Sequence, residues 1–259
     1  AAPIELPGRS VQTIHCDSRG NMWIGAFSDN AYVKSSGGSM RKVFDEMQDV
    51  RCFFEDGMHM WIGTSKGLYV VDINTQKVIK HYNLKNNLVR SVVKDRQGRM
   101  WIGTFGSGLL VYDSRMRLIR QLTKLNGFPS NTFNAVIADQ RGCIWCATGE
   151  GLVSFPKGDV RAFTTYAAAS RLNNLHIRAV AEDEQGNLWV STNKGISCMK
   201  RGKDYFVNYD YRDNVAMGNY NPGSVAVSAS GMLYFGSTKG LTCFNPQNVL
   251  IKREAQRCL

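Results

Sequence analysis

One nine-residue pattern recurs along the chain at near-constant spacing, and it restricts the possible folds more than any other feature. Four copies align without a gap, at residues 17–25, 95–103, 139–147 and 183–191, and each reads Asp-x-x-Gly-x-apolar-Trp. Two looser copies lie at 55–63, where the glycine has moved to Gly57, and at 228–236, where Tyr234 replaces the tryptophan. The six large aromatic residues are separated by 38, 40, 44, 44 and 45 positions. A period of this length is typical of the blades of a β-propeller.

Each repeat has the pattern of a small antiparallel sheet. Alternating apolar residues lead into the Asp-x-x-Gly turn and a second strand follows, which is a hairpin signal. In the third copy, further strands are expected near 109–112 and 118–122, which gives four strands per repeat. A single sheet of this kind cannot bury both faces, and closing a stack of such sheets into a ring removes the exposed edges. The sequence therefore predicts an all-β propeller of four-stranded antiparallel blades with six repeats, as a closed six-bladed ring or as part of a larger or tandem propeller.

We expect one propeller domain over residues 1–259, forming a fragment of a larger protein. Residues 4–6 and 249–252 are candidates for an outer strand that joins the ends of the ring. The blade cores are predicted near 11–35, 50–74, 89–113, 133–156, 177–200 and 223–246.

The repeated residues themselves have structural roles in this interpretation. The tryptophan is expected to wedge between neighbouring blades, because a large ring at a repeated position fits that role better than ligand contact. The repeated aspartate is expected to cap its own hairpin turn.

Composition narrows the range of partners. The net charge of +11 favours anionic partners, but no run of five basic residues occurs, so no nucleic-acid partner is expected. No apolar run reaches the ~18 residues of a membrane-spanning helix. The seven cysteines do not suggest a disulfide framework, and we expect free thiols that are largely buried.

The repeated pattern, continued by Thr-x-x-Gly-Leu as in residues 64–68, resembles the two-component regulator propeller repeat of Bacteroides-type hybrid two-component systems. The closing stretch, residues 236–246, is similar to the end of the last propeller in such sensors. The resemblance implies a periplasmic sensor region of an inner-membrane protein, two propellers in tandem, a homodimer, and a histidine kinase regulated by a polysaccharide fragment. No binding-site motif is shared across the family, so no ligand residue can be transferred to this chain.

The candidate chemical motifs are weak. Cys143 and Cys146 have CxxC spacing, but residues three apart on a strand point to opposite faces, and no second ligand pair completes a metal site. The four histidines fall at different repeat positions, which disfavours a catalytic pair. We therefore expect no catalytic residue, metal or cofactor. Two alternatives remain open: an enzyme similar to streptogramin lyases, which have a related propeller, and a scaffold that binds protein partners.

One end of the predicted disc is better suited to a ligand than the other. The loops between blades and between the second and third strands emerge on the same end, where basic residues outnumber acidic ones, while the Asp-x-x-Gly turns emerge on the opposite end. Arginine forks, amides and rings suit the carboxylates, sulfates and hydroxyls of an acidic oligosaccharide. Arg51, Arg90 and Arg178 are predicted to converge on the channel mouth as the main contacts. The full set of predicted ligand-binding residues is Arg51, Arg90, Arg178, His176, Phe105, Asn134, Tyr220 and Lys194.

Overall fold

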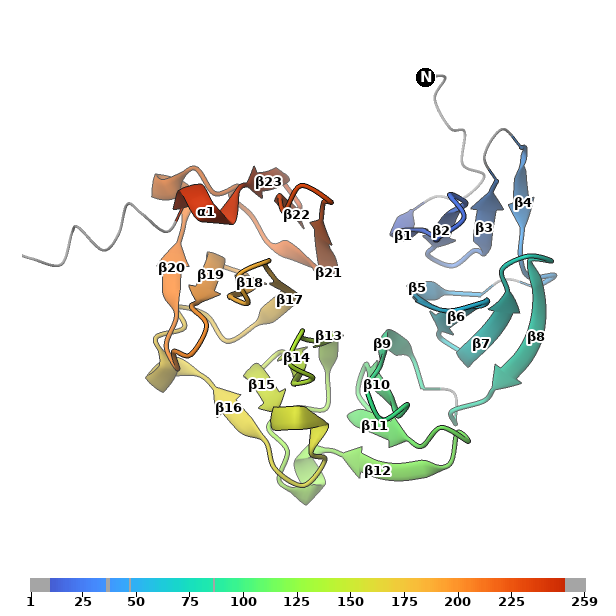
Figure 1. The fold of residues 1–259 in the computed structure, drawn as a ribbon, viewed down its shortest axis with the longest axis horizontal. Helices are drawn as coiled ribbons and strands as arrows, with labels where there is room; N and C mark the ends of the chain where they lie inside the picture. Colours follow the sequence, from blue (N-terminus) through green and yellow to red (C-terminus); the bar gives the residue numbers. More distant parts are fainter. Residues whose placement is uncertain (1–9, 36–37, 47, 86, 250–259) are drawn as a thin grey trace, which may run out of the picture.

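The computed structural model describes residues 10–35, 38–46, 48–85 and 87–249. They form six antiparallel sheets arranged around a common axis (Figure 1). Within each sheet the strands follow chain order, with the first strand innermost and the last at the rim. The predicted all-β propeller of six repeats is confirmed.

The six sheets are numbered as blades in chain order. Five of them have four strands and the sixth has three. Blades 1 to 3 consist of β1 (Val11–Cys16), β2 (Met22–Ala26), β3 (Ala31–Lys34) and β4 (Met40–Lys42); β5 (Val50–Asp56), β6 (His59–Thr64), β7 (Gly67–Asp72) and β8 (Lys77–Tyr82); β9 (Val89–Lys94), β10 (Met100–Thr104), β11 (Leu109–Tyr112) and β12 (Leu118–Leu122). Blades 4 to 6 consist of β13 (Phe133–Ala138), β14 (Ile144–Thr148), β15 (Gly151–Phe155) and β16 (Thr164–Tyr166); β17 (Ile177–Glu182), β18 (Leu188–Thr192), β19 (Gly195–Met199) and β20 (Val207–Tyr209); β21 (Tyr220–Val227), β22 (Leu233–Ser237) and β23 (Gly240–Phe244).

Helical structure is confined to short segments in the part of the chain that the structure describes. Its helices are four single 3-10 turns and the four-residue helix α1 (Pro246–Val249), and none is long and apolar enough to cross a membrane. The 3-10 turns are Lys124–Asn126, Pro156–Gly158, Ala168–Ser170 and Tyr211–Asp213.

The repeated aspartate has two roles, of which the sequence indicated one. Asp17 Oδ1 accepts the backbone N–H groups of Arg19 (3.0 Å) and Asn21 (2.8 Å), which confirms the predicted turn cap. Its Oδ2 accepts the indole N–H of Trp23 at 2.8 Å. The same three bonds recur around Asp95, Asp139 and Asp183. Each carboxylate thus satisfies the one polar atom of a buried indole, which would otherwise be costly to bury.

Blade 2 departs from this pattern because its turn is shorter. β5 continues through Asp56 and β6 begins at His59, so the turn consists of Gly57 and Met58. No aspartate occupies the capping position, and the buried indole nitrogen of Trp61 has no hydrogen-bond partner within the described ranges.

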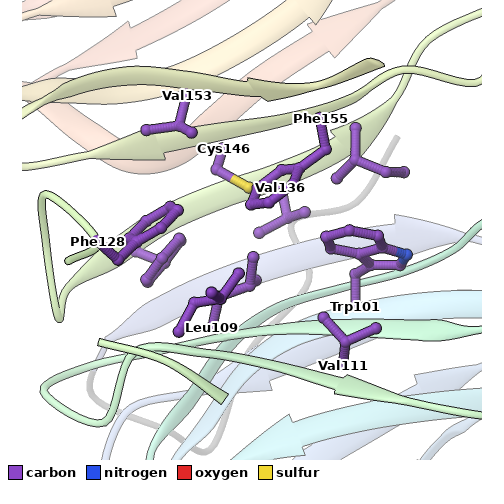
Figure 2. Close-up of a cluster of buried hydrophobic side chains, with 11 residues drawn as sticks. Trp101, Leu109, Val111, Phe128, Val136, Cys146, Val153 and Phe155 are labelled. Carbon is purple, nitrogen blue, oxygen red and sulfur yellow. The ribbon is translucent and has the colours of Figure 1, made fainter. Parts of the chain in front are cut away.

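The tryptophans pack between adjacent blades. Figure 2 shows Trp101 with Leu109 and Val111 of blade 3 beside Val136, Cys146 and other apolar side chains of blade 4. Trp101 is fully buried, and its ring lies 4.9 Å from that of Phe155, centroid to centroid. The predicted wedge is confirmed.

One expectation does not hold, and another concerns residues outside the described ranges. Among the described residues, blade 6 has three strands where four were predicted, because the chain turns into α1 soon after β23. The candidate closing segments 4–6 and 249–252 lie outside the described residues, except for Val249 at the end of α1. The six described cysteines are free; Cys16 and Cys243 are exposed, and the other four are buried or partly buried.

Candidate functional site

A β-bulge occurs at the same place in the innermost strand of blades 1 to 5. In each blade the pairing with the second strand skips one residue, and the skipped residues are Gln12, Arg51, Arg90, Asn134 and Arg178. A bulge leaves its extra residue out of the ladder and can re-aim the side chain. Blade 6 has a wider irregularity here, between Tyr220 and Val225. The innermost strands therefore present a ring of polar side chains at one level, which we call the bulge ring.

The bulge ring borders one open cavity of about 580 Å³. Gln12, Arg51, Arg90 and Asn134 line it together with residues 221–224 of β21. Arg178 is close enough to affect the ionisation of Arg90.

The amides of the bulge ring hold two of the arginines. Arg51 donates from Nη1 to Gln12 Oε1 at 3.1 Å, and Arg90 donates from Nη1 to Asn134 Oδ1 at 2.8 Å. Asn134 is 4% exposed and donates to the carbonyl of Ile177 at 2.7 Å, which fixes its orientation. The guanidinium of Arg90 is thus positioned by a buried amide.

A second layer of side chains comes from the residue that follows the second strand. Arg51 lies 4.9 Å from the ring centroid of Phe27, and Arg90 lies 4.3 Å from that of Phe105, both as cation–π contacts. In blade 5 the equivalent residue is Asn193, whose Oδ1 accepts from Arg178 Nε at 2.8 Å. The side-chain neighbours of the three arginines are therefore Phe27, Phe105 and Asn193, each of which directly follows the second strand of its blade.

Within the described residues, Arg51 is the arginine of the bulge ring that forms an ion pair, and its partner is Asp49. Asp49 Oδ2 accepts from Arg51 Nη2 at 2.6 Å. Burial lowers the pKa of Arg90 below its ordinary value, and the charges of Arg51 and Arg178 lower it further, while Asp49 acts in the opposite direction. An excess of positive charge is thus held at the channel mouth, which suits an anionic group.

Comparison with known proteins identifies the family to which the repeat belongs. A sequence profile described as the two component regulator propeller matches residues 5–28, 83–106 and 171–194. The chain therefore contains two-component regulator propeller repeats at these three places. In each matched segment the match runs from before the innermost strand to just past the second strand.

The most informative structural relative is a crystal structure of the extracellular domain of the hybrid two component system BT3049 from B. thetaiotaomicron. It is 39% identical with a TM-score of 0.90, and the match covers 96% of this propeller. The propeller spans only 35% of that larger domain.

Two further structures share the fold alone. Virginiamycin B lyase from Staphylococcus aureus is 11% identical with a TM-score of 0.68, over 92% of this chain and 85% of its own. PorZ, from Porphyromonas gingivalis, is 12% identical with a TM-score of 0.65, over 91% and 38%. No curated protein sequence matches the chain.

The eight predicted site residues of this two-component regulator propeller fall into three groups. Arg51, Arg90 and Asn134 line the same cavity, with Arg178 nearby and Phe105 stacked on Arg90. His176 and Lys194 are exposed, but neither belongs to the described lining of the cavity. Tyr220 contradicts the expectation: it is 1% exposed and its hydroxyl bonds Thr242 Oγ1 at 2.7 Å, so it is a core residue.

Sequence reasoning missed three members of the site, Gln12, Phe27 and Asp49. Gln12 lies five residues before Asp17, as Arg90 lies five before Asp95, so aligning the repeats on the turn aspartate would have found it.

The cysteines and histidines of the described ranges do not gather into a second site. Burial raises the pKa of Cys143 to about 12 and that of Cys146 well above its ordinary value, so neither thiol is activated. No group of three metal-ligating side chains occurs in the described ranges. His15 contacts Glu55 at 3.3 Å on the turn end, while His81 stacks on Tyr69 at 4.0 Å.

Proposed function

We propose that this propeller is a ligand-sensing module in the extracytoplasmic region of a two-component signalling protein. It binds a polysaccharide-derived, anionic oligosaccharide at the bulge ring and has no catalytic role of its own. In the full-length protein, which is a periplasmically oriented homodimer, a second propeller adjoins it and a histidine kinase reads its state. The repeat type and the similarity to the BT3049 extracellular domain support this assignment.

The anionic ligand is inferred from one observation: Arg90 is half-buried beside two other arginines, and it donates a hydrogen bond to the neutral amide of Asn134. Holding like charges together is unfavourable, so a binding anion gains charge-assisted hydrogen bonds and relieves the repulsion. Phe27 and Phe105 offer faces on which a sugar ring can stack.

The test is calorimetric titration with heparin-type, chondroitin-type and neutral oligosaccharides at two salt concentrations. Arg90→Ala and Arg178→Ala are expected to weaken binding of the acidic sugars by about 10- to 100-fold, because a charge-assisted hydrogen bond contributes about 1.5–3 kcal/mol. Raising the salt concentration should weaken the wild-type interaction.

The matched control is Arg141→Ala, an exposed arginine in the blade 4 turn at the opposite end of the disc. It should bind as the wild type does. Equal losses in Arg141→Ala and Arg90→Ala would refute the assignment of the binding face. Binding of neutral sugars alone, without salt dependence, would refute the anionic ligand.

A further inference from the structure

The three arginines of the bulge ring differ in what their guanidinium nitrogens bind. Arg51 donates to Asp49 Oδ2 from Nε at 3.1 Å and from Nη2 at 2.6 Å, and it donates from Nη1 to Gln12 Oε1 at 3.1 Å. The side chains of Arg51 and Asp49 are only 19% and 17% exposed, so salt and water screen this ion pair little. The charge of Arg51 is therefore neutralised within the fold, and each of its three nitrogens already has an acceptor.

Arg90 and Arg178 have neutral partners instead. Arg90 donates from Nη1 to Asn134 Oδ1 at 2.8 Å, and Arg178 donates from Nε to Asn193 Oδ1 at 2.8 Å. In the part of the chain that the structure describes, the other nitrogens of these two guanidiniums have no acceptor, and neither guanidinium pairs with a carboxylate. Both arginines thus keep N–H groups and an uncompensated positive charge for a bound anion.

Asn134 connects these two arginines across blades 3, 4 and 5. Its Oδ1 accepts from Arg90, and its Nδ2 donates at 2.7 Å to the carbonyl of Ile177, the residue that precedes Arg178. Burial, and then the charges of Arg51 and Arg178, lower the pKa of Arg90, as expected for cations held near one another. A buried amide therefore sits between two guanidiniums whose charges an anion can offset together.

Asp49 makes the two sides of the bulge ring electrostatically different. At blade 2, the carboxylate of Asp49 and the guanidinium of Arg51 offset each other. Across blades 3 to 5, two positive charges are held without a paired carboxylate among the described residues. An anionic group placed beside Arg51 would lie close to the carboxylate of Asp49, and like charges at short range repel. Asp49 therefore limits the negative charge that the site accepts.

We propose that the bulge ring binds one anionic group of its ligand, at Arg90, Asn134 and Arg178, and that Asp49 disfavours a second anionic group beside Arg51. The ligand is then an oligosaccharide of low charge density, with a single carboxylate or sulfate on each bound disaccharide. Chains that carry both groups on the same disaccharide are disfavoured. This inference rests on the proposed function and narrows it, because it separates Arg51 from the arginines that contact the anionic group.

The test uses three chondroitin-type hexasaccharides with one backbone: one with carboxylates only, one with sulfates only after carboxyl reduction, and one with both groups. In calorimetric titration, the wild type should bind the form with both groups no more tightly than the better of the other two. The better of those two identifies the anionic group as carboxylate or sulfate. Asp49→Asn keeps an oxygen acceptor for Arg51 and removes the negative charge. It should strengthen binding of the form with both groups by about tenfold, and binding of the singly charged forms by less than about threefold.

The matched control is Asp113→Asn, which removes the same charge from another arginine ion pair. Asp113 Oδ2 lies 2.7 Å from Arg117 Nε in the turn between β11 and β12, at the opposite end of the disc. This variant should leave all three affinities unchanged. Equal strengthening of all three ligands by Asp49→Asn, or the same gain in Asp113→Asn, would show that net charge determines the selectivity and would overturn the proposal.

A double variant tests the role of Arg51 without changing the net charge. Arg51→Gln combined with Asp49→Asn removes the ion pair, and it should bind the singly charged hexasaccharides within about twofold of the wild type. Arg90→Gln and Arg178→Gln should each weaken the same interaction by at least about tenfold. A loss in the double variant as large as that of Arg90→Gln would mean that Arg51 contacts the anionic group, and this result would overturn the proposal.

Chemical modification of arginine provides a readout that needs no ligand. Phenylglyoxal labelling with peptide mapping should modify Arg90 and Arg178 faster than Arg51 in the wild type, and Asp49→Asn should raise the rate at Arg51. Equal labelling of the three arginines, together with clear binding of the hexasaccharides, would overturn this inference and leave the proposed function standing. Labelling as expected, with no binding of any hexasaccharide, would refute the proposed function and the ligand class with it.

Discussion

The two ends of the disc use charged side chains in opposite ways. At the turn end, the carboxylates of Asp17, Asp95, Asp139 and Asp183 are each occupied by backbone N–H groups and an indole. At the bulge ring, Arg90 lies close enough to Arg51 and Arg178 for their charges to oppose its own, and the carboxylate of Asp49 pairs with Arg51. The first set of charges has its hydrogen-bond partners within the fold, whereas the second keeps like charges close together, as the proposed binding of an anionic ligand requires.

The largest effect is expected at the turn end. Asp139→Ala removes the cap of two backbone N–H groups and leaves the indole N–H of Trp145 buried without a partner. We expect the free energy of unfolding to fall by about 3 kcal/mol, measured by denaturant titration. The control is Asp159→Ala, where an exposed carboxylate accepts the N–H of Arg161, and its cost should stay below about 1 kcal/mol. Equal costs would mean that the indole bond contributes nothing.

A smaller effect is expected from removing the indole N–H itself. Trp145→Phe breaks the 3.0 Å bond to Asp139 and should cost about 1–2 kcal/mol more than Trp61→Phe, since the latter removes a buried N–H that has no partner. Thermal unfolding of the two variants provides the comparison. A Trp61→Phe variant that loses as much stability would show that ring volume, and not the hydrogen bond, determines the difference.

These aspartates also show which structural features can be predicted from the sequence alone. The repeat period, the all-β fold and the tryptophan wedge follow from local pattern, because a repeated hairpin must bury the same face each time. The bond from Asp17 to Trp23 depends on the rotamers of two side chains, which a pattern does not specify. The slipped glycine at Gly57 was visible in the sequence, but its consequence for Trp61 required knowledge of that bond.

The site was only partly predictable for a similar reason. Arg51, Arg90 and Arg178 stood out because they share a repeat position near the start of a strand. The bulge that directs them is a property of strand pairing and leaves no residue signature. Tyr220 looked like a loop aromatic near the channel, but the irregular start of β21 directs it into the core against Thr242.

At the turn end, acid should reduce the free energy of unfolding by a modest amount that depends on the carboxylate of Asp17. Burial opposes ionisation of Asp17, but the hydrogen bonds from Trp23, Asn21 and Arg19 outweigh it and lower the pKa below its ordinary value of 3.8. A lowered pKa in the folded state stabilises the protein above the ordinary value, and this contribution is lost as the pH falls through the folded pKa. Between about pH 5 and pH 3, Asp17→Asn should therefore lose less stability than the wild type, as measured by chemical unfolding at each pH. Parallel curves would contradict the role of Asp17.

The smallest effect on stability is expected at the bulge ring. Burial and the nearby arginines oppose the charge of Arg90, so Arg90→Met removes that penalty while losing the bond to Asn134 and the contact with Phe105. We expect a change within about 1 kcal/mol, in either direction, by denaturant titration. A loss as large as that of Asp139→Ala would show that Arg90 supports the fold and would remove the contrast between the two ends.

The bulges have an evolutionary consequence. Because the extra residue of each innermost strand lies outside the ladder, its identity can change with little effect on strand pairing, and glutamine, arginine and asparagine all occur at this position around one ring. Duplicated repeats could thus diverge one position at a time while the shared scaffold is conserved. Recognition specificity in such a lineage would then be a short combination of interchangeable residues, and a new specificity would require few mutations.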